Sequence, residues 1–358
     1  MLSYPLISTL SIHRQLRFIS NYDLGIRKDN VICIPQPGLA NRDAFIEELT
    51  RRKGIVDVAF ASTLPSKATQ RSSVDWEGKE ADRKESWQVI SVDDRYLNVM
   101  EIDLVEGENF KRFQDVEANP RFIVNRKALE IMGLRNPIGR KFSAWGSSGT
   151  IIGVVDNFHF RPLHENLSPL VLCIAPNEFL HVLVKIRPQS AGLQEILAGL
   201  KDVWSKFAPG RRFTYEFLED VIASNYRTES NMNTEFKSFT FLGIFISCLG
   251  LVGLVAYIVE RKRKEIGIRK VLGAGLPSIL GQIHKEFLWP ILAANLIAWP
   301  IAYWRMSSWL RNFAFHTNIP IGLFLAAAAA VLGLGQAAVI WQTMKAARRC
   351  PVDSLKYE

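Results

Sequence analysis

Ser238–Val259, with the sequence SFTFLGIFISCLGLVGLVAYIV, is a run of 22 residues without a charged side chain. As an α-helix it would be about 33 Å long, which is enough to cross the hydrocarbon core of a bilayer. Two further uncharged runs follow, Phe287–Trp304 with 18 residues and Ile321–Trp341 with 21 residues. Three such runs exceed what the core of a soluble domain needs. We therefore expect residues 238–358 to form an α-helical transmembrane domain with three complete spans.

The basic charge of the chain is concentrated beside these runs. The 358 residues include 44 Lys and Arg against 35 Asp and Glu, a net charge of +9, and the mean hydropathy is +0.06. Residues 238–358 hold 13 basic and 5 acidic side chains, whereas the preceding residues hold 31 and 30. A nucleic-acid-binding protein would carry its basic excess on a folded polar face. Because the excess here flanks apolar segments, we expect contact with membrane lipids and no nucleic acid.

The connecting segments predict how the spans are oriented. Residues 260–286 contain seven Lys and Arg side chains and residues 342–358 contain four, whereas residues 305–320 contain only two. Loops rich in Lys and Arg remain on the cytoplasmic side of a membrane. We therefore expect residues 260–286 and 342–358 inside, and residues 305–320 and the large region before Ser238 outside.

The N-terminal segment fits none of these spans. Met1–Ile12 is apolar but too short to cross a bilayer, and it lacks the basic stretch that opens a signal peptide. A domain outside the membrane needs an element that exports it. We interpret residues 1–19 as a partial membrane span and linker, which would make this chain the C-terminal piece of a longer protein. The alternative is a mobile tail, with export driven by the first complete span.

Residues 20–237 alternate between strand and helix patterns and predict an α+β extracytoplasmic domain. Two βαβ units are expected, one at Asn30–Pro35, Asn41–Lys53 and Val56–Thr63, the other at His181–Arg187, Ala191–Phe207 and Phe213–Phe217. The insertion between them is expected to be rich in β-structure, with strands at Trp87–Val92, Phe122–Val124 and Thr150–Val155 and a helix at Arg126–Met132 ending at Gly133. Phe217–Lys237 is expected to be a helical stalk. Cys33 and Cys173 both fall in this domain, where they either pair or stay free.

No stretch of the sequence carries the residues of an enzyme or cofactor site. The nearest match to a phosphate-binding loop, Gly133–Lys141, has the wrong spacing and no hydroxyl residue after the lysine. His159, His164 and Glu165 lie close together, but no second histidine completes an HExxH motif and no cysteine stands at zinc-ligand spacing. We therefore expect no catalytic residue, no cofactor and no metal, and we interpret these three residues as part of a polar loop.

The cytoplasmic segment Glu260–Gly275, ERKRKEIGIRKVLGAG, is the most informative motif. Apolar residues alternate with charged ones, which predicts a short amphipathic helix to which a soluble partner can bind. A turn at Gly273–Gly275 would follow it. The helix is assigned to Glu265, Ile266, Ile268, Arg269, Lys270, Val271 and Leu272, and the topology anchors before it are Arg261, Lys262, Arg263 and Lys264. The alternative is an ordinary basic flank of a membrane helix, which would explain the anchors but not the ordered remainder.

Arg261–Gly275, with a glycine-bearing span before it and two spans after it, resembles the MacB/FtsX-type permeases of ABC transporters. Motifs in the preceding domain resemble the MacB-like periplasmic core domain of that family. These motifs are VDDRYL (Val92–Leu97) with LVEGENF (Leu104–Phe110), IVNRKA (Ile123–Ala128) with NPIGRKF (Asn136–Phe142), and IGVVDNF (Ile152–Phe158) through LHE (Leu163–Glu165). The tail Pro351–Glu358 is similar to the family's common ending.

The resemblance implies a periplasmic domain with an inserted subdomain, set on four membrane helices of which three are complete here. It places the chain in a bacterial inner membrane with the large domain in the periplasm, and it makes residues 265–272 the ATPase-coupling helix. The implied partners are a cytoplasmic ABC ATPase dimer, a second permease half or homologous subunit, and a periplasmic adaptor or outer-membrane channel. Small residues would let the membrane helices approach closely: Gly243, Gly250, Gly253, Ala326–Ala330, Gly333 and Gly335.

Two functions are compatible with this reading. The first is a permease that exports or extracts a lipid, lipoprotein, peptide or drug, with ATP hydrolysis performed by the separate ATPase. The second is an FtsX-like signalling scaffold that uses ATP-driven motion to regulate an extracytoplasmic enzyme such as a cell-wall hydrolase. The large, two-part external domain favours the first.

Overall fold

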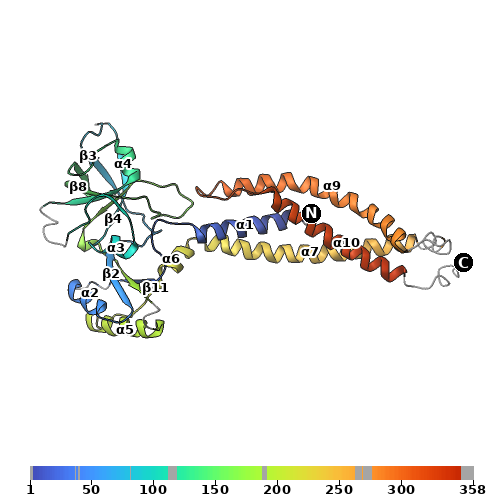
Figure 1. Cartoon of the computed structure of the whole chain (residues 1–358), viewed down its shortest axis with the longest axis horizontal. Helices are drawn as coiled ribbons and strands as arrows, with labels where there is room; N and C mark the ends of the chain where they lie inside the picture. Colours follow the sequence, from blue (N-terminus) through green and yellow to red (C-terminus); the bar gives the residue numbers. More distant parts are fainter. Residues whose placement is uncertain are drawn as a thin grey trace. The chain divides into compact units, whose positions relative to one another are not determined.

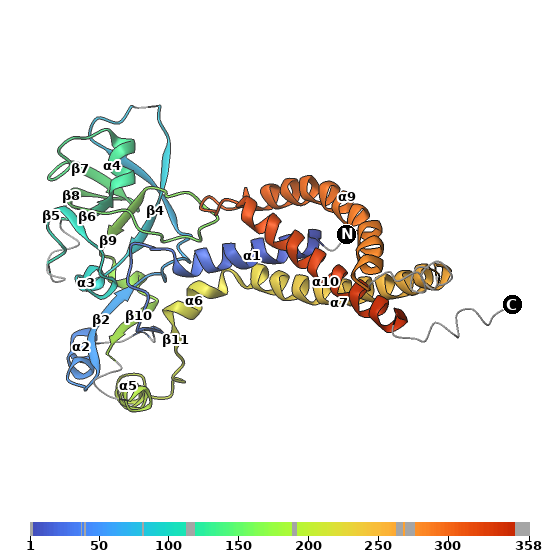
Figure 2. The same ribbon diagram turned by 45° about the vertical axis from the view of Figure 1, so that its right-hand side comes forward.

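The computed structural model describes residues 3–36, 38, 41–80, 82–111, 119–187, 192–262, 268 and 276–347. The chain divides into two compact units. The α/β unit comprises Asn21–Tyr226, and the helical unit comprises Met1–Ser20 together with Arg227–Glu358. Every strand of the described residues belongs to the α/β unit (Figures 1 and 2). The expected α+β domain and C-terminal helical region are therefore both present.

Four strands of the α/β unit form an antiparallel sheet in the order β11-β1-β10-β2. Helix α2 connects β1 to β2, but β10 lies between these two strands in the sheet. Helix α5 connects β10 to β11, and these two strands lie on opposite sides of β1. The two expected βαβ units thus exist as interleaved, split units. Their bounds are β1 Val31–Pro35, α2 Arg42–Thr50, β2 Ile55–Ala61, β10 His181–Ile186, α5 Leu193–Phe207 and β11 Glu216–Phe217. The last strand is shorter than the one expected at Phe213–Phe217.

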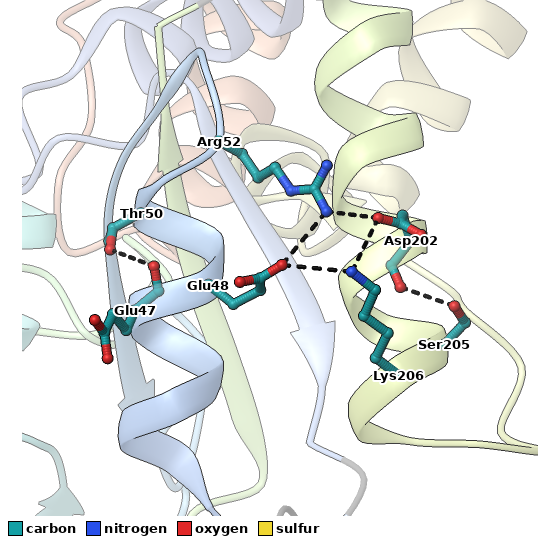
Figure 3. A network of polar contacts seen from close by, with 7 residues as sticks. All are labelled: Glu47, Glu48, Thr50, Arg52, Asp202, Ser205 and Lys206. Atoms are coloured by element: carbon teal, nitrogen blue, oxygen red, sulfur yellow. Dashed lines mark hydrogen bonds and ion pairs between the residues drawn. The ribbon is translucent and has the colours of Figure 1, made fainter.

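Helices α2 and α5 share one apolar core with this sheet, and their polar sides are joined at the surface. Figure 3 shows a ring of four alternating charges formed by Glu48 of α2, by Arg52 just after the end of α2, and by Asp202 and Lys206 of α5. Arg52 lies 2.5 Å from Asp202 and 3.5 Å from Glu48, and Lys206 lies 3.4 Å from Glu48 and 3.6 Å from Asp202. Exposed ion pairs contribute at most about 1 kcal/mol each. The buried side chains therefore supply most of the stability of this layer: Phe45, Leu49, Ile196, Leu200, Val203 and Trp204 from the helices and Ile32, Val58, Phe60 and Val184 from the sheet.

The insertion between β2 and β10 forms a seven-stranded sheet in the order β5-β8-β6-β9-β4-β3-β7. Because β7 also pairs with β8, six of the strands close into a barrel, and β5 pairs with β8 outside the ring. The expected β-rich insertion is confirmed. Its elements are β3 Arg71–Trp76, β4 Glu85–Ser91, α3 Tyr96–Met100, β5 Leu104–Gly107, β6 Arg121–Asn125, α4 Arg126–Met132, β7 Lys141–Ala144, β8 Ser147–Val155 and β9 Leu170–Cys173. Helix α4 ends as expected at Gly133, which has a φ of 66°.

Gly107, at the end of β5, is the glycine of the LVEGENF motif, and its surroundings explain why no larger residue fits there. Its φ is +83°, and a Cβ there would lie 2.1 Å from the carbonyl oxygen of Ile152 and 2.9 Å from the Cα of Gly153. We expect Gly107→Ala to lower the free energy of unfolding by at least about 3 kcal/mol, since backbone atoms cannot rotate away from the added methyl group. Chemical denaturation monitored by tryptophan fluorescence measures the loss.

Gly133→Ala is the matched control for this prediction. Gly133 also has a positive φ, but a Cβ there would meet no atom within 4 Å. The expected loss is therefore only the conformational penalty of about 1–2 kcal/mol. Equal losses in the two variants would show that the close approach to Ile152 is not what requires a glycine at position 107.

The described residues of the helical unit form four long helices, α1 Ser3–Asn21, α7 Arg227–Arg261, α9 Leu276–Leu310 and α10 Ile321–Ala347. The three expected spans lie within α7, α9 and α10. Among the described residues, Arg227–Ile258 is long and apolar enough to cross a membrane, and Ile321–Ala337 is a shorter apolar helix. Three complete spans remain a prediction. Helix α9 contains Pro290 and Pro300 and is curved in Figure 2, as expected for a helix with two internal prolines.

Helix α1 extends beyond the apolar stub expected from the sequence. It continues through the basic stretch His13–Arg17, and one face is buried along its whole length. Ile7 of this face shares a core with Ala302 of α9 and with Phe324 and Ala327 of α10. The N-terminal residues therefore belong to the helical unit. Figures 1 and 2 both show α1 alongside α7.

Three of the glycines expected to allow close helix packing have no such contact within the described part of this chain. A Cβ added to Gly250 or Gly253 of α7, or to Gly333 of α10, would meet no atom within 4 Å. These glycines face away from the other described helices, so they do not provide close helix contact within this chain. Ala327, in contrast, is buried between helices as expected.

Candidate functional site

The described part of the chain contains no group of three or more His, Cys, Asp or Glu residues that could hold a metal ion. Cys33 and Cys173 are both buried and free. The candidate site is therefore one that could transmit movement. The best candidate lies where the chain joins the α/β unit, at the incoming connection Tyr22–Gly25 and the outgoing connection Asn225–Tyr226.

The incoming connection, which follows α1, is held by the loop after β8. This loop comprises Asp156–Glu165 and is called the connection loop below. The His159 N–H donates a hydrogen bond of 2.8 Å to the carbonyl oxygen of Leu24, and the His159 ring meets the Tyr22 ring edge-on at 5.4 Å. Gly25 has a φ of +70°, and a Cβ there would lie 2.9 Å from the carbonyl oxygen of Asn157. The connection loop thus holds three of the first five residues of the unit.

The outgoing connection is held by the same loop. The Leu163 N–H donates to the Tyr226 hydroxyl at 2.8 Å, and the His164 ring stacks on the Tyr226 ring at 5.5 Å. The neighbouring Asn225 side chain donates to the Ser66 hydroxyl at 2.8 Å. The sequence predicted one continuous helix over Phe217–Lys237. These contacts instead hold Asn225 and Tyr226 in a turn between α6 (Leu218–Ser224) and α7.

The connection loop is itself fixed to the β-rich insertion. Phe158, Phe160 and Leu163 are buried, and the Asn157 side chain accepts a hydrogen bond of 2.9 Å from the Lys127 N–H at the start of α4. A displacement of either connection therefore has a direct route into the barrel. The interpretation of His159, His164 and Glu165 as a polar loop agrees with these contacts, and Glu165 pairs with Arg161.

Burial lowers the pKa of the His159 imidazole, an effect that Asp23 partly offsets. Because the folded-state pKa lies below that of the unfolded chain, the neutral ring is the form that the fold accommodates. The stabilising effect is complete above about pH 6.5 and is lost as the pH falls through the folded-state pKa. Intrinsic amide exchange slows as the pH falls from 7.5 to 5. Relative to that intrinsic rate, we expect the amides of residues 22–25 to lose protection over this range, and His159→Gln to abolish that excess loss. An equal excess in both proteins would assign it to another group.

A second polar cluster joins the two sheets of the α/β unit. Asp93, which follows β4, is fully buried and accepts hydrogen bonds from the Phe60 N–H of β2 at 2.9 Å and from the Arg95 N–H at 3.2 Å. Burial raises the pKa of this carboxyl well above its ordinary value, and the two N–H donors partly offset the rise. Nearby, Ser91 Oγ donates to the Ala175 carbonyl at 3.0 Å and accepts from the Ala175 N–H at 2.7 Å. The barrel and the four-stranded sheet are therefore joined by a buried hydrogen bond from Phe60 to Asp93.

The residues predicted to couple the chain to a partner lie mostly outside the described residues. This holds for Glu265, Ile266, Arg269, Lys270, Val271 and Leu272, and for the anchors Arg263 and Lys264. Of the remainder, Arg261 ends α7, the Lys262 N–H donates to the carbonyl oxygen of Ile258 at 2.9 Å, and the Ile268 side chain is 49% exposed. The assignment of the coupling helix stays a prediction.

Comparison with known proteins bears on the helical unit directly. Residues 237–351 match the family model described as FtsX-like permease C-terminal. Residues 237–351 are therefore similar to the C-terminal domain of FtsX-like permeases. The expected resemblance to MacB/FtsX-type permeases is thereby confirmed. The FtsX-like domain begins within α7 and includes both α9 and α10.

Curated relatives extend the similarity into the α/β unit. The chain is 22% identical over 289 residues to the ABC transporter permease YknZ of Bacillus subtilis, covering 75% of this chain and 70% of YknZ. It is 23% identical over 289 residues to the macrolide export ATP-binding/permease protein MacB of Sodalis glossinidius, covering 75% and 43%. The MacB protein of Bdellovibrio bacteriovorus is 22% identical over 276 residues, covering 70% and 41%. This FtsX-like chain thus spans less than half the length of each MacB relative.

Two solved structures are similar to the chain. One is the periplasmic region of MacB from Actinobacillus actinomycetemcomitans, with a TM-score of 0.41 and 14% identity, covering 57% of this chain and 94% of that one. The other is the extracellular domain of YknZ from Gram-positive bacteria, with a TM-score of 0.37 and 17% identity, covering 52% and 98%.

Proposed function

We propose that this FtsX-like chain is the permease subunit of an ABC transporter whose ATP is hydrolysed by a separate cytoplasmic ATPase dimer. The helical unit lies in a bacterial inner membrane, with three spans in α7, α9 and α10, and the α/β unit lies in the periplasm. ATP-driven movement of the coupling helix passes outward through the membrane helices. Its work is the export or extraction of a lipid, lipoprotein, peptide or drug.

The observation that carries this proposal is the attachment of both chain connections to one loop. Helix α7 begins directly after Tyr226 and runs to Arg261 without a break, a length of about 52 Å at 1.5 Å per residue. An unbroken helix moves as a stiff rod. Its first residue follows a side chain bonded to the connection loop, and its last residue lies in the basic cytoplasmic segment, so a single element joins the two proposed sites of action.

The partners follow from the same reading. A permease domain of this kind needs an ATPase that supplies the movement and a second permease half or subunit that completes the membrane assembly. A periplasmic adaptor or outer-membrane channel would receive the exported molecule. The chain itself is not expected to be an enzyme.

A labelling experiment tests the orientation that this function requires. Single cysteines are introduced at the exposed positions Lys201, Asn318 and Arg261 in a variant without the native cysteines. In intact spheroplasts, a membrane-impermeant maleimide should label Lys201→Cys and Asn318→Cys at once, and Arg261→Cys only after permeabilisation. Labelling of Arg261→Cys but not of Lys201→Cys in intact spheroplasts would overturn the proposal.

A further inference from the structure

One buried glutamine links the N-terminal helix to the connection between α9 and α10. Gln15 of α1 is 0% exposed, and its side-chain amide pairs with residues 311–320, which join α9 to α10. Gln15 Nε2 donates to the carbonyl oxygen of Phe315 at 3.0 Å. Gln15 Oε1 accepts from the N–H of Thr317 at 2.9 Å and from its hydroxyl at 3.3 Å. The side chain therefore satisfies both a donor and an acceptor of the connecting backbone.

The segment that Gln15 holds is also fixed at both of its ends. The Phe313 N–H donates to the Leu310 carbonyl at 3.0 Å, which continues α9 into the segment, and the Leu323 N–H donates to the Pro320 carbonyl at 3.0 Å. The buried Phe313 ring contacts Trp309 at 5.1 Å. A segment fixed in this way has little freedom to absorb a displacement of α9 or α10, so it passes that displacement to the side chain that holds it.

Two further polar links accompany Gln15 between α1 and the other described helices of the helical unit. Thr9 and the buried Thr240 of α7 lie 3.0 Å apart through their hydroxyls, and the Ser3 hydroxyl donates to the Asn295 side chain of α9 at 2.5 Å. Gln15 is the link nearest the end of α1, only six residues before Asn21, where the α/β unit begins. The hydroxyl of Ser11, one turn earlier on the same buried face, has no hydrogen-bond partner in the described structure.

We propose that Gln15 is a positioning residue that makes α1 move as one body with the α9–α10 connection. Movement of α9 and α10 then reaches Tyr22 and Leu24, which follow α1 and are held by the connection loop. The α/β unit accordingly receives the movement through two helices, α7 and α1, rather than through α7 alone. This inference rests on the proposed function, because it concerns the route by which ATP-driven movement travels.

The test uses the full chain in nanodiscs with its ATPase. Spin labels on Lys201→Cys of α5 and on the exposed Tyr257→Cys of α7 report the distance between the two units with and without ATP. In Gln15→Leu, the ATP-dependent change in distance should be reduced, because only the route through α7 remains, while basal ATP hydrolysis is unchanged. Hydrogen exchange of the Thr317 amide should accelerate about fivefold to tenfold, as expected for one lost hydrogen bond. Ser11→Ala, a buried change on the same face, should match the wild type in all three measurements.

A second variant separates a lost link from a damaged fold. Cysteines at Gln15 and Thr317 in a variant without the native cysteines, joined by a short reducible cross-linker, should restore the distance change, and reduction should remove it again; here the distance is read between fluorophores on unnatural amino acids at positions 201 and 257, which do not react with either reagent. The inference is overturned if Gln15→Leu keeps the full distance change, or if the cross-linker restores nothing. An unchanged distance in the wild type itself would overturn the proposed function and this inference with it, which distinguishes that failure from a failure of Gln15 alone.

Discussion

An Ile268→Asp variant is expected to lose substrate-stimulated ATP hydrolysis while it inserts into the membrane normally. Ile268 is an apolar side chain that is 49% exposed, on the segment proposed to contact the ATPase. Burying an unpaired carboxylate in that contact would cost several kcal/mol, which reduces the population of the bound complex by orders of magnitude. Co-purification with the ATPase and hydrolysis assays in nanodiscs measure the effect. Leu272→Asp is expected to behave in the same way.

The matched control changes charge in the same segment without placing it in the contact. Arg261→Gln and Lys262→Gln should alter the sidedness of the helices or their contact with lipid more than the ATPase coupling. Normal ATPase binding and stimulation in Ile268→Asp and Leu272→Asp would remove this segment from the mechanism and leave Arg261–Lys264 as a topological anchor.

Tyr226→Ala is expected to release the outgoing connection from the connection loop. The substitution removes a buried aromatic ring, which costs about 3–5 kcal/mol in the core of a domain, and it leaves the Leu163 N–H without its acceptor. Tyr226→Phe keeps the stack on His164 and removes only the hydroxyl, at an expected cost of about 1–3 kcal/mol. Hydrogen exchange of the Leu163 amide and of residues 225–226 measures both effects, and the ATP-dependent movement of the α/β unit should fail in the alanine variant.

Tyr215→Ala provides the comparison for this site, because Tyr215 is an exposed tyrosine in the same unit. Its ring packs on Phe213 and Phe217, so its loss should cost about 1–2 kcal/mol, less than the loss of Tyr226, and leave the movement intact. If Tyr226→Ala preserved the movement despite faster exchange at Leu163, the connection loop would have only a structural role.

Much of the α/β unit follows from local sequence patterns. The alternation in Val31–Pro35 and His181–Ile186 predicts strands, and the spacing of apolar residues in Leu193–Phe207 predicts the face that α5 buries. The barrel closure between β7 and β8 and the insertion of β10 between β1 and β2 were not predicted. These pairings join strands that are distant in the sequence, and no local pattern specifies which strands become neighbours.

The contacts that hold the connections of the α/β unit and the α9–α10 connection were not predicted from the sequence, for a similar reason. Tyr226 and Gln15 act through partners far away in the chain, Leu163 for the first and Phe315 and Thr317 for the second. Gln15 lies in α1, which also contains basic residues, so nothing in the sequence marks it as the polar residue that is buried and bonded to another segment. Asp93 lies in the VDDRYL motif, yet its bond to Phe60 depends on how two sheets meet. The assignment of the coupling helix rests on charge and spacing alone and stays a prediction.

The exposure of individual side chains decides which positions are suitable for labelling. Met100 lies near the middle of the external domain in sequence, but its side chain is buried and would resist labelling from either side of the membrane. Lys201 lies on the exposed side of α5, where a probe is accessible without disturbing the core. Tyr257 is exposed on α7, close in sequence to the proposed cytoplasmic segment.

The central claim is that ATP hydrolysis by a separate subunit moves the α/β unit of this chain. The most direct measurement is the distance distribution between spin labels on Lys201→Cys and Tyr257→Cys in a chain that lacks only the native cysteines, with the ATPase bound, in the absence of nucleotide and after ATP hydrolysis in the presence of vanadate, which traps ADP and vanadate on the ATPase. The account predicts that the distribution shifts on trapping and returns when nucleotide is removed. An identical distribution in both states, with ATP hydrolysis fully active, would contradict it.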